Sequence, residues 1–183
     1  MTRRIPTAEM TVGPFFPREF GQGANDLTKL GRRSPNGGRK ITIGGRVTQA
    51  DGNPVDNLVL ELWQADWQGI YRDPADPRLP EADPDFLGWG RAATDRNGEY
   101  LFRTLMPGAR DGRAPHVNLL LLFSGLMRQL QTVMFFDAAP ADPVYAAVPA
   151  ERRALLVAQR ESADRYRFDI RLRGGNETPF FDD

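Results

Sequence analysis

The chain contains one short pattern of side chains that could bind a metal, a histidine and an asparagine two positions apart. His116 and Asn118 open a run of apolar residues, 116–125, that is typical of a buried strand. Residues i and i+2 of a strand point to the same face, so the two side chains should be neighbours. An imidazole is a good ligand for a transition metal, whereas a neutral amide is a weak one. The pattern therefore supplies only one good metal ligand. A lone histidine is more often a hydrogen-bonded residue than a ligand.

A second candidate for metal binding is the segment 72–85, which is rich in proline and carboxylates. Oxygen-rich loops can hold calcium, but the spacing of these acidic residues matches no EF-hand, and the prolines make the segment stiff. We therefore expect an ordinary loop here. The acidic residues concerned are Asp73, Asp76, Glu81, Asp83 and Asp85.

Other kinds of catalytic site find little support in the chain. No serine lies in a G-x-S-x-G context, and no glycine cluster resembles a phosphate-binding loop. There is no cysteine, which excludes disulfides, zinc fingers and a thiol nucleophile. The residues alone thus predict no self-sufficient catalytic constellation.

Length and composition indicate one globular domain. The 183 residues carry 24 basic and 24 acidic side chains, so the net charge is zero and nucleic acid is not the expected partner. The longest apolar run is Leu119–Phe123, far shorter than the roughly 20 residues that span a bilayer. With no secretion signal recognisable at the start, the sequence predicts a soluble, cytoplasmic protein.

Most of the chain beyond residue 40 has the pattern of short strands separated by turns. The segments 91–95 and 99–104 flank Arg96-Asn97-Gly98, which predicts a hairpin. One helix is expected over 149–161, with Pro149 at its first position. Many strands and one short helix near the C-terminus indicate an all-β sandwich over 41–183. The remaining strands are predicted at 41–47, 58–66, 116–125, 131–136 and 166–172.

Residues 1–40 differ from the rest and are expected to form an N-terminal arm and loop. The part from 21 to 40 is rich in glycine and basic residues and can bury little surface. The preceding part contains Phe15, Phe16 and Phe20, and such a cluster is seldom left in solvent. These rings either cover this chain's own core or pack on another chain, and the sequence leaves both alternatives open.

Three stretches together resemble the intradiol ring-cleavage dioxygenases. The segment 90–108 is similar to a hairpin of that family, although prealbumin-like modules share its turn. The segment 166–183 resembles the carboxyl end of members built from two chains. The most specific stretch is 41–71, which contains the spaced elements Ile43, Gly45, Val47, Gly52, Val55, Leu60-Glu61-Leu62 and Gly69-x-Tyr71.

This resemblance implies a prealbumin-like β-sandwich and a degenerate iron site. Catalytic members hold ferric iron with two tyrosinates and two histidines. Tyr71 matches the first tyrosine and His116 the first histidine, but Asn118 stands at the second histidine, and 107–115 contains no tyrosine. Arg113 matches an arginine near the iron of catalytic chains. With two of four ligands missing, the resemblance implies no metal and no catalytic residue in this chain.

The resemblance further implies a partner. Two-chain members pair an iron-bearing β chain with an α chain whose site is degenerate, and residues 11–17 are similar to the arm of such α chains. Gly13 and Pro14 would then line the substrate pocket of the partner, within a higher hetero-oligomer. The implied reaction is cleavage of 3,4-dihydroxybenzoate by O₂ to 3-carboxy-cis,cis-muconate, with ferric iron held by the β chain. Two alternatives stay open: a prealbumin-like structural or binding module, and a relative that binds another metal through Tyr71, His116 and water.

Overall fold

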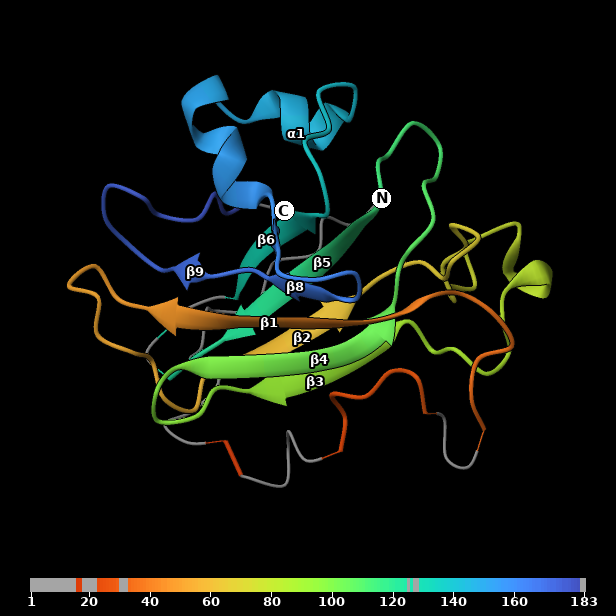
Figure 1. Cartoon of the computed structure of the whole chain (residues 1–183), viewed down its shortest axis with the longest axis horizontal. Coiled ribbons are helices and arrows are strands. Elements are labelled where there is room, and N and C mark those ends of the chain that lie inside the picture. Colours follow the sequence, from red (N-terminus) through yellow and green to blue (C-terminus); the bar gives the residue numbers. More distant parts are fainter. Residues whose placement is uncertain (1–15, 18–22, 30–32, 125, 127–128, 182–183) are drawn as a thin grey trace, which may run out of the picture.

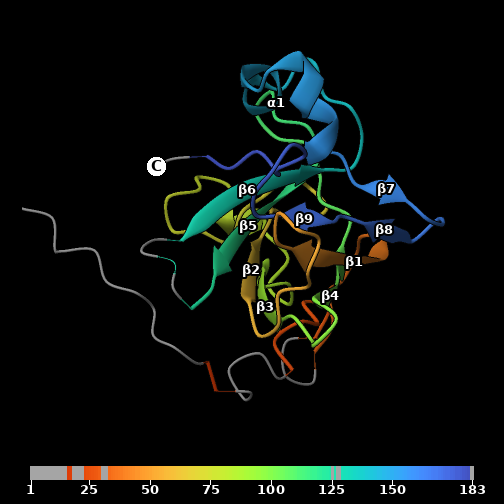
Figure 2. The same cartoon turned by 90° about the vertical axis from the view of Figure 1, so that its left-hand side faces the viewer.

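The chain folds into two β-sheets packed face to face (Figures 1 and 2). The computed structural model describes residues 16–17, 23–29, 33–124, 126 and 129–181. The first sheet has the order β4-β1-β8-β7, and β9 also pairs with β1. Its strands are β1 (Lys40–Thr48), β4 (Glu99–Leu105), β7 (Gln159–Arg160), β8 (Arg165–Arg167) and β9 (Ile170–Arg171).

The second sheet carries the candidate site and has the order β3-β2-β5-β6, with every neighbouring pair antiparallel. Its strands are β2 (Val59–Trp63), β3 (Trp89–Ala93), β5 (His116–Leu122) and β6 (Leu130–Phe135). The strands predicted at 116–125 and 131–136 are both present and pair with each other, since His116 lies opposite Phe135 and Leu121 opposite Leu130. The all-β sandwich is therefore confirmed.

The core between the sheets follows from alternation along the strands. In β1 the buried residues Ile41, Ile43, Gly45 and Val47 face inward and alternate with partly exposed positions. In β5 the inward side chains are apolar, whereas Asn118 points to the opposite face. The face of the second sheet that carries Asn118 is thus the outer one.

The hairpin predicted around Arg96-Asn97-Gly98 is wrong in its pairing, although the turn itself is present. The Asp95 side chain accepts from the backbone N–H groups of Asn97 and Glu99, and Gly98 takes a φ of 75°. Beyond the turn, however, β3 pairs with β2 and β4 pairs with β1, so the strands enter different sheets. The connection is therefore a crossover between the two layers.

Two other predicted elements are shorter than expected. The strand at 166–172 is divided into β8 and β9 because the Asp169 carboxylate, not a backbone carbonyl, accepts from the Arg46 N–H group at 2.9 Å. The helix expected over 149–161 is a 3₁₀ helix over Ala150–Leu156. It ends where the backbone N–H group of Ala158 bonds to the carbonyl oxygen of Phe135 and draws the chain back to β6.

An unpredicted α-helix, α1 (Pro143–Ala147), precedes this 3₁₀ helix and is capped by Asp142.

Segments of the same chain cover the edges of the sandwich. Residues 24–28 lie along β3 and β4, where Ala24 accepts from Arg91 and Leu27 donates to Arg103. At the other end of the second sheet, Phe181 donates to Gln131 of β6. The fourth edge strand, β7, is only two residues long. Part of the predicted arm thus belongs to this chain's own sandwich. Within the described ranges, no helix is long and apolar enough to cross a membrane.

Candidate functional site

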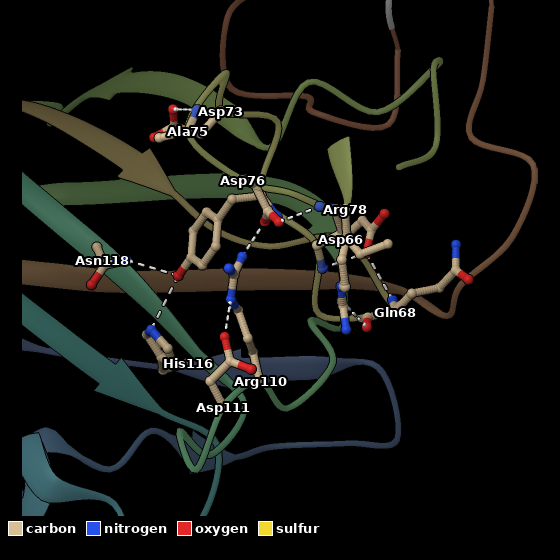
Figure 3. A network of polar contacts seen from close by, with 12 residues as sticks. Asp66, Gln68, Asp73, Ala75, Asp76, Arg78, Arg110, Asp111, His116 and Asn118 are labelled. Atoms are coloured by element: carbon tan, nitrogen blue, oxygen red, sulfur yellow. Dashed lines mark hydrogen bonds and ion pairs between the residues drawn. The ribbon is translucent and has the colours of Figure 1, made fainter. Parts of the chain in front are cut away.

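Tyr71, His116 and Asn118 lie together on the outer face of the second sheet. His116 and Asn118 are labelled in Figure 3. His116 and Asn118 are neighbours on β5, and Tyr71 enters from the loop that follows β2. The phenol oxygen of Tyr71 is 3.1 Å from Nε2 of His116 and 3.2 Å from Nδ2 of Asn118. The three side chains therefore form one hydrogen-bonded group.

The hydrogen bonds also fix where the protons are. Nδ1 of His116 is 2.7 Å from the carbonyl oxygen of Ala114, so it carries the proton, and Nε2 accepts from the Tyr71 hydroxyl. Burial lowers the pKa of His116, and the charge of Arg113 acts in the same direction. Burial raises the pKa of Tyr71 against the effects of Asn118 and the nearby arginines. At neutral pH the pair is a phenol bonded to a neutral imidazole.

The acidic segment 72–85 organises its own backbone and is a loop as predicted, except for a single turn of 3₁₀ helix at Leu79–Glu81. Asp76 accepts from the N–H groups of Tyr71 and Arg78, and Asp73 accepts from that of Ala75. Asp83 receives the N–H group of Asn36 at 2.7 Å. Among the residues that the structure describes, no group of three or more His, Cys, Asp or Glu side chains could hold a metal ion.

The segment 107–115, where the second tyrosine would be expected, closes in a tight turn. Asp111 and Gly112 both have positive φ, 46° and 77°, and Arg110 and Arg113 pair across them. Two consecutive positive φ values are the geometry of a two-residue hairpin loop. Arg110 is placed 5.6 Å from the centre of the Tyr71 ring and forms an ion pair with Asp76.

Two residues of this region were not singled out for the site from the sequence. Trp63 of β2 stacks on Tyr71, with ring centres 6.1 Å apart, and its outward position follows from the alternation of that strand. Asp142 accepts from Nε of Arg113 at 2.8 Å, and its place before Pro143 is the signal of a helix cap. Trp63, Tyr71, Arg110, Arg113 and His116 line a cleft of about 380 Å³.

These donors do not fit ferric iron, the cofactor of intradiol dioxygenases. Of the three positions matched to iron ligands, only the Tyr71 oxygen and the His116 nitrogen are suitable, because the third position is an amide. Nδ2 of Asn118 faces Tyr71 and the Trp63 carbonyl as a hydrogen-bond donor. A hard trivalent ion needs anionic oxygen ligands, and the cleft offers no second tyrosine. Its carboxylates, Asp73, Asp76 and Asp111, are bonded to the backbone of their own loop or to Arg110. Gly13 and Pro14, the predicted pocket-lining residues, lie outside the described residues together with Phe15 and Phe20.

Comparison with known proteins gives consistent matches over most of the chain. The sequence model of a family described as Dioxygenase matches residues 11–174. The protocatechuate 3,4-dioxygenase alpha chain of Burkholderia cepacia is 37% identical, with 100% of both chains covered. The beta chain from the same organism is 34% identical over 96% of this chain and 84% of its own length.

Solved structures show the same fold at lower identity. The dioxygenase domain of a carbohydrate-binding fusion protein from Streptomyces sp. SirexAA-E superposes with a TM-score of 0.60 at 23% identity, covering 93% of this chain and all of that one. The 3-chlorocatechol 1,2-dioxygenase of Rhodococcus opacus 1CP gives 0.57 at 19% identity, covering 91% and 71%. The full-length matches, and the site positions that the resemblance brought together, lead to one conclusion: this chain belongs to the intradiol ring-cleavage dioxygenase family.

Proposed function

We propose that this chain is the non-catalytic α subunit of a protocatechuate 3,4-dioxygenase. The enzyme would cleave 3,4-dihydroxybenzoate with O₂ to 3-carboxy-cis,cis-muconate. A homologous β subunit would hold the ferric iron, and this chain would shape the substrate pocket and the assembly. The cytoplasmic location stays a prediction.

The donor set around Tyr71 carries this proposal. A phenol, an imidazole and an amide bonded to one another replace a four-ligand site. The likeness to both an alpha and a beta chain of one organism further supports a pair of homologous subunits. A binding module without an enzymatic role has less support, because the family match extends over residues 11–174 and not over the shared turn alone.

The N-terminal arm is the part of this chain that we assign to the partner's pocket. Residues 24–28 are attached to this chain's own sandwich, so the part of the arm that we assign to the partner lies before them. The ten residues from Gly23 back to Gly13 span at most about 33–36 Å when extended. That reach allows Gly13 and Pro14 to cross to a neighbouring subunit. Glycine permits close approach to a ligand, and proline adds a rigid wall without an N–H donor.

The proposal is tested by producing the chain alone and together with a homologous chain from the same genome that contains both tyrosines and an H-x-H strand. Alone, this chain should contain no stoichiometric iron and show no tyrosinate-to-iron absorption. The complex should contain one iron per pair and should convert 3,4-dihydroxybenzoate. One iron per chain in the isolated protein, with visible absorption, would contradict a non-catalytic role.

A further inference from the structure

The chain contains two Asn-Gly pairs, Asn36-Gly37 and Asn97-Gly98, a sequence that favours spontaneous deamidation. In this reaction the backbone nitrogen of the glycine loses its proton and attacks the side-chain carbonyl carbon of the asparagine. The amide C–N bond breaks, ammonia leaves with the proton, and water opens the resulting succinimide to aspartate or isoaspartate. Glycine hinders this ring closure least because it has no side chain. Since the two pairs are identical in sequence, their surroundings decide which of them reacts.

The turn around Asn97 restrains the attacking nitrogen. The backbone N–H group of Gly98 donates to the carbonyl oxygen of Asp95 at 2.8 Å, and Gly98 is buried. The N–H group of Asn97 donates to the Asp95 carboxylate at 2.8 Å, and the Asn97 carbonyl oxygen accepts from Nε of Arg46 at 2.7 Å. Ring closure would have to break these hydrogen bonds before the nitrogen could lose its proton and turn toward the side chain. The folded chain therefore protects Asn97.

The bend at Asn36 lacks this restraint. The N–H group of Gly37 has no hydrogen-bond partner among the described residues, and Asn36 is exposed. The Asn36 side chain makes one long hydrogen bond, from Nδ2 to Asp83 at 3.4 Å. That bond holds the nitrogen that leaves in the reaction and not the carbon that is attacked. The attacking nitrogen and its target are therefore both free to react.

We propose that Asn36 is a site of spontaneous deamidation in the folded protein, whereas the identical pair at Asn97-Gly98 is protected. The modification takes no cofactor and consumes only water. It lies in the segment 33–39, and it does not depend on the function proposed above.

Deamidation at Asn36 would break the connection between the segment 33–39 and Asp83. The backbone N–H group of Asn36 donates to Oδ2 of the buried Asp83 at 2.7 Å, and Nδ2 donates to Oδ1. The reaction replaces the Nδ2 donor with a carboxylate oxygen. Two like charges would then meet where a hydrogen bond had been, and they repel each other.

The isoaspartate product would also displace the two glycines that follow. It adds one carbon to the main chain directly before Gly37 and Gly38. A Cβ atom at Gly37 would lie 2.8 Å from the Trp67 ring, and one at Gly38 would lie 2.9 Å from it, so the backbone has no room to move toward this ring. The segment should therefore move away from Trp67 and expose more of its side chain, which is 41% exposed before the reaction.

The reaction is followed in the full folded chain at mildly alkaline pH by mass spectrometry of tryptic peptides. Trypsin separates the two sites into the peptides 34–39 and 97–103, each of which contains one asparagine. We expect Asn36 to be converted at least fivefold faster than Asn97. In concentrated urea the two rates should become similar, since glycine follows both asparagines. If Asn97 reacts as fast as Asn36 in the folded chain, or if the difference persists unchanged in urea, the proposal is wrong.

Substitution by the product residue tests the effect on Trp67. Asn36→Asp should raise the quenching of tryptophan fluorescence by acrylamide, a neutral quencher, at least 1.5-fold. The increase should be absent when Trp67→Phe is combined with Asn36→Asp. Asn97→Asp is the matched control, because it adds the same charge in the exposed turn before β4 and should leave the quenching unchanged. Unchanged quenching in Asn36→Asp, or an equal rise in Asn97→Asp, would show that the modification does not release the segment.

Discussion

The phenol oxygen of Tyr71 accepts one hydrogen bond and donates another, and both partners lie on the same strand. A histidine at position 118 would bring a second nitrogen lone pair toward this oxygen. The amide of Asn118 brings an N–H donor, so the group closes on itself without an ion. One change of residue type thereby converts a metal-binding pattern into a hydrogen-bonded one.

Placing a histidine at position 118 should therefore give this chain a metal-binding site. Asn118→His should create a set of two imidazoles and a phenol that binds Co²⁺ or Zn²⁺ at least tenfold more tightly than the original chain. Calorimetry and the visible spectrum of bound Co²⁺ measure the effect. Asn118→Gln is the control, because it changes the side chain and keeps the amide. Identical affinities of the two variants would show that the three positions do not converge as a ligand set.

His116 should make stability depend on pH in a defined direction. Burial holds its pKa below the unfolded value of about 6.5, so below that pH the unfolded chain binds more protons. The free energy of unfolding should therefore fall as the pH drops below about 6.5, by up to about 1.4 kcal/mol per unit, until the folded-state pKa is passed.

Urea denaturation between pH 7.5 and 5 measures this slope. His116→Gln cannot gain the proton, so the variant should lose the slope in that window. The carboxylates with lowered pKa, Asp26, Asp76 and Asp142, act only at more acidic pH. If the unfolding free energy of the original chain and of His116→Gln changes with pH in the same way, His116 is not the cause of the pH dependence.

At the scale of elements, local pattern predicted strands and turns better than it predicted what they pair with. The alternation of β1 and the turn at Gly98 are visible in the sequence. That β3 and β4 enter different sheets is decided by their partners β2 and β1, which are remote in the chain. The spacing of His116 and Asn118 likewise fixed their common face. The approach of Tyr71 and Arg110 depends on loops of 69–76 and 107–115, and only the family resemblance anticipated the first of them.

The contribution of the segment 24–28 to the stability of the sandwich can be measured. Leu27 is buried and packs so closely on β3 that a Cβ at Gly90 would lie 2.4 Å from its Cδ1. Leu27→Ala should lower the free energy of unfolding by about 2–5 kcal/mol, as large-to-small changes in a core do. Leu87→Ala removes a leucine that is 38% exposed and should cost much less. If urea denaturation shows an equally small loss of unfolding free energy for Leu27→Ala and Leu87→Ala, the segment does not belong to the sandwich.

At the scale of the whole molecule, the proposed role of the arm in the partner's pocket can be tested in the complex. In the assembled enzyme, Gly13→Trp should raise the KM for 3,4-dihydroxybenzoate several-fold and leave the iron content unchanged, because the pocket narrows while the ligands are elsewhere. Gly175→Trp is the matched control, since a Cβ at that position meets nothing within 4 Å. Unchanged kinetics of an assembled, iron-loaded Gly13→Trp enzyme would place the arm away from the pocket.

The covered edges of the sandwich have a consequence for subunit identity. An open strand edge pairs through backbone groups, which are the same in every protein, so it would accept a second copy as readily as a different subunit. Here residues 24–28 and Phe181 occupy the edges beside β3, β4 and β6, and β7 offers only two residues. In the hetero-oligomer proposed above, recognition along these described edges would rest on side chains, which differ between homologous subunits. Divergence at the surface of two homologous chains would then be enough to favour pairing of unlike chains over like ones.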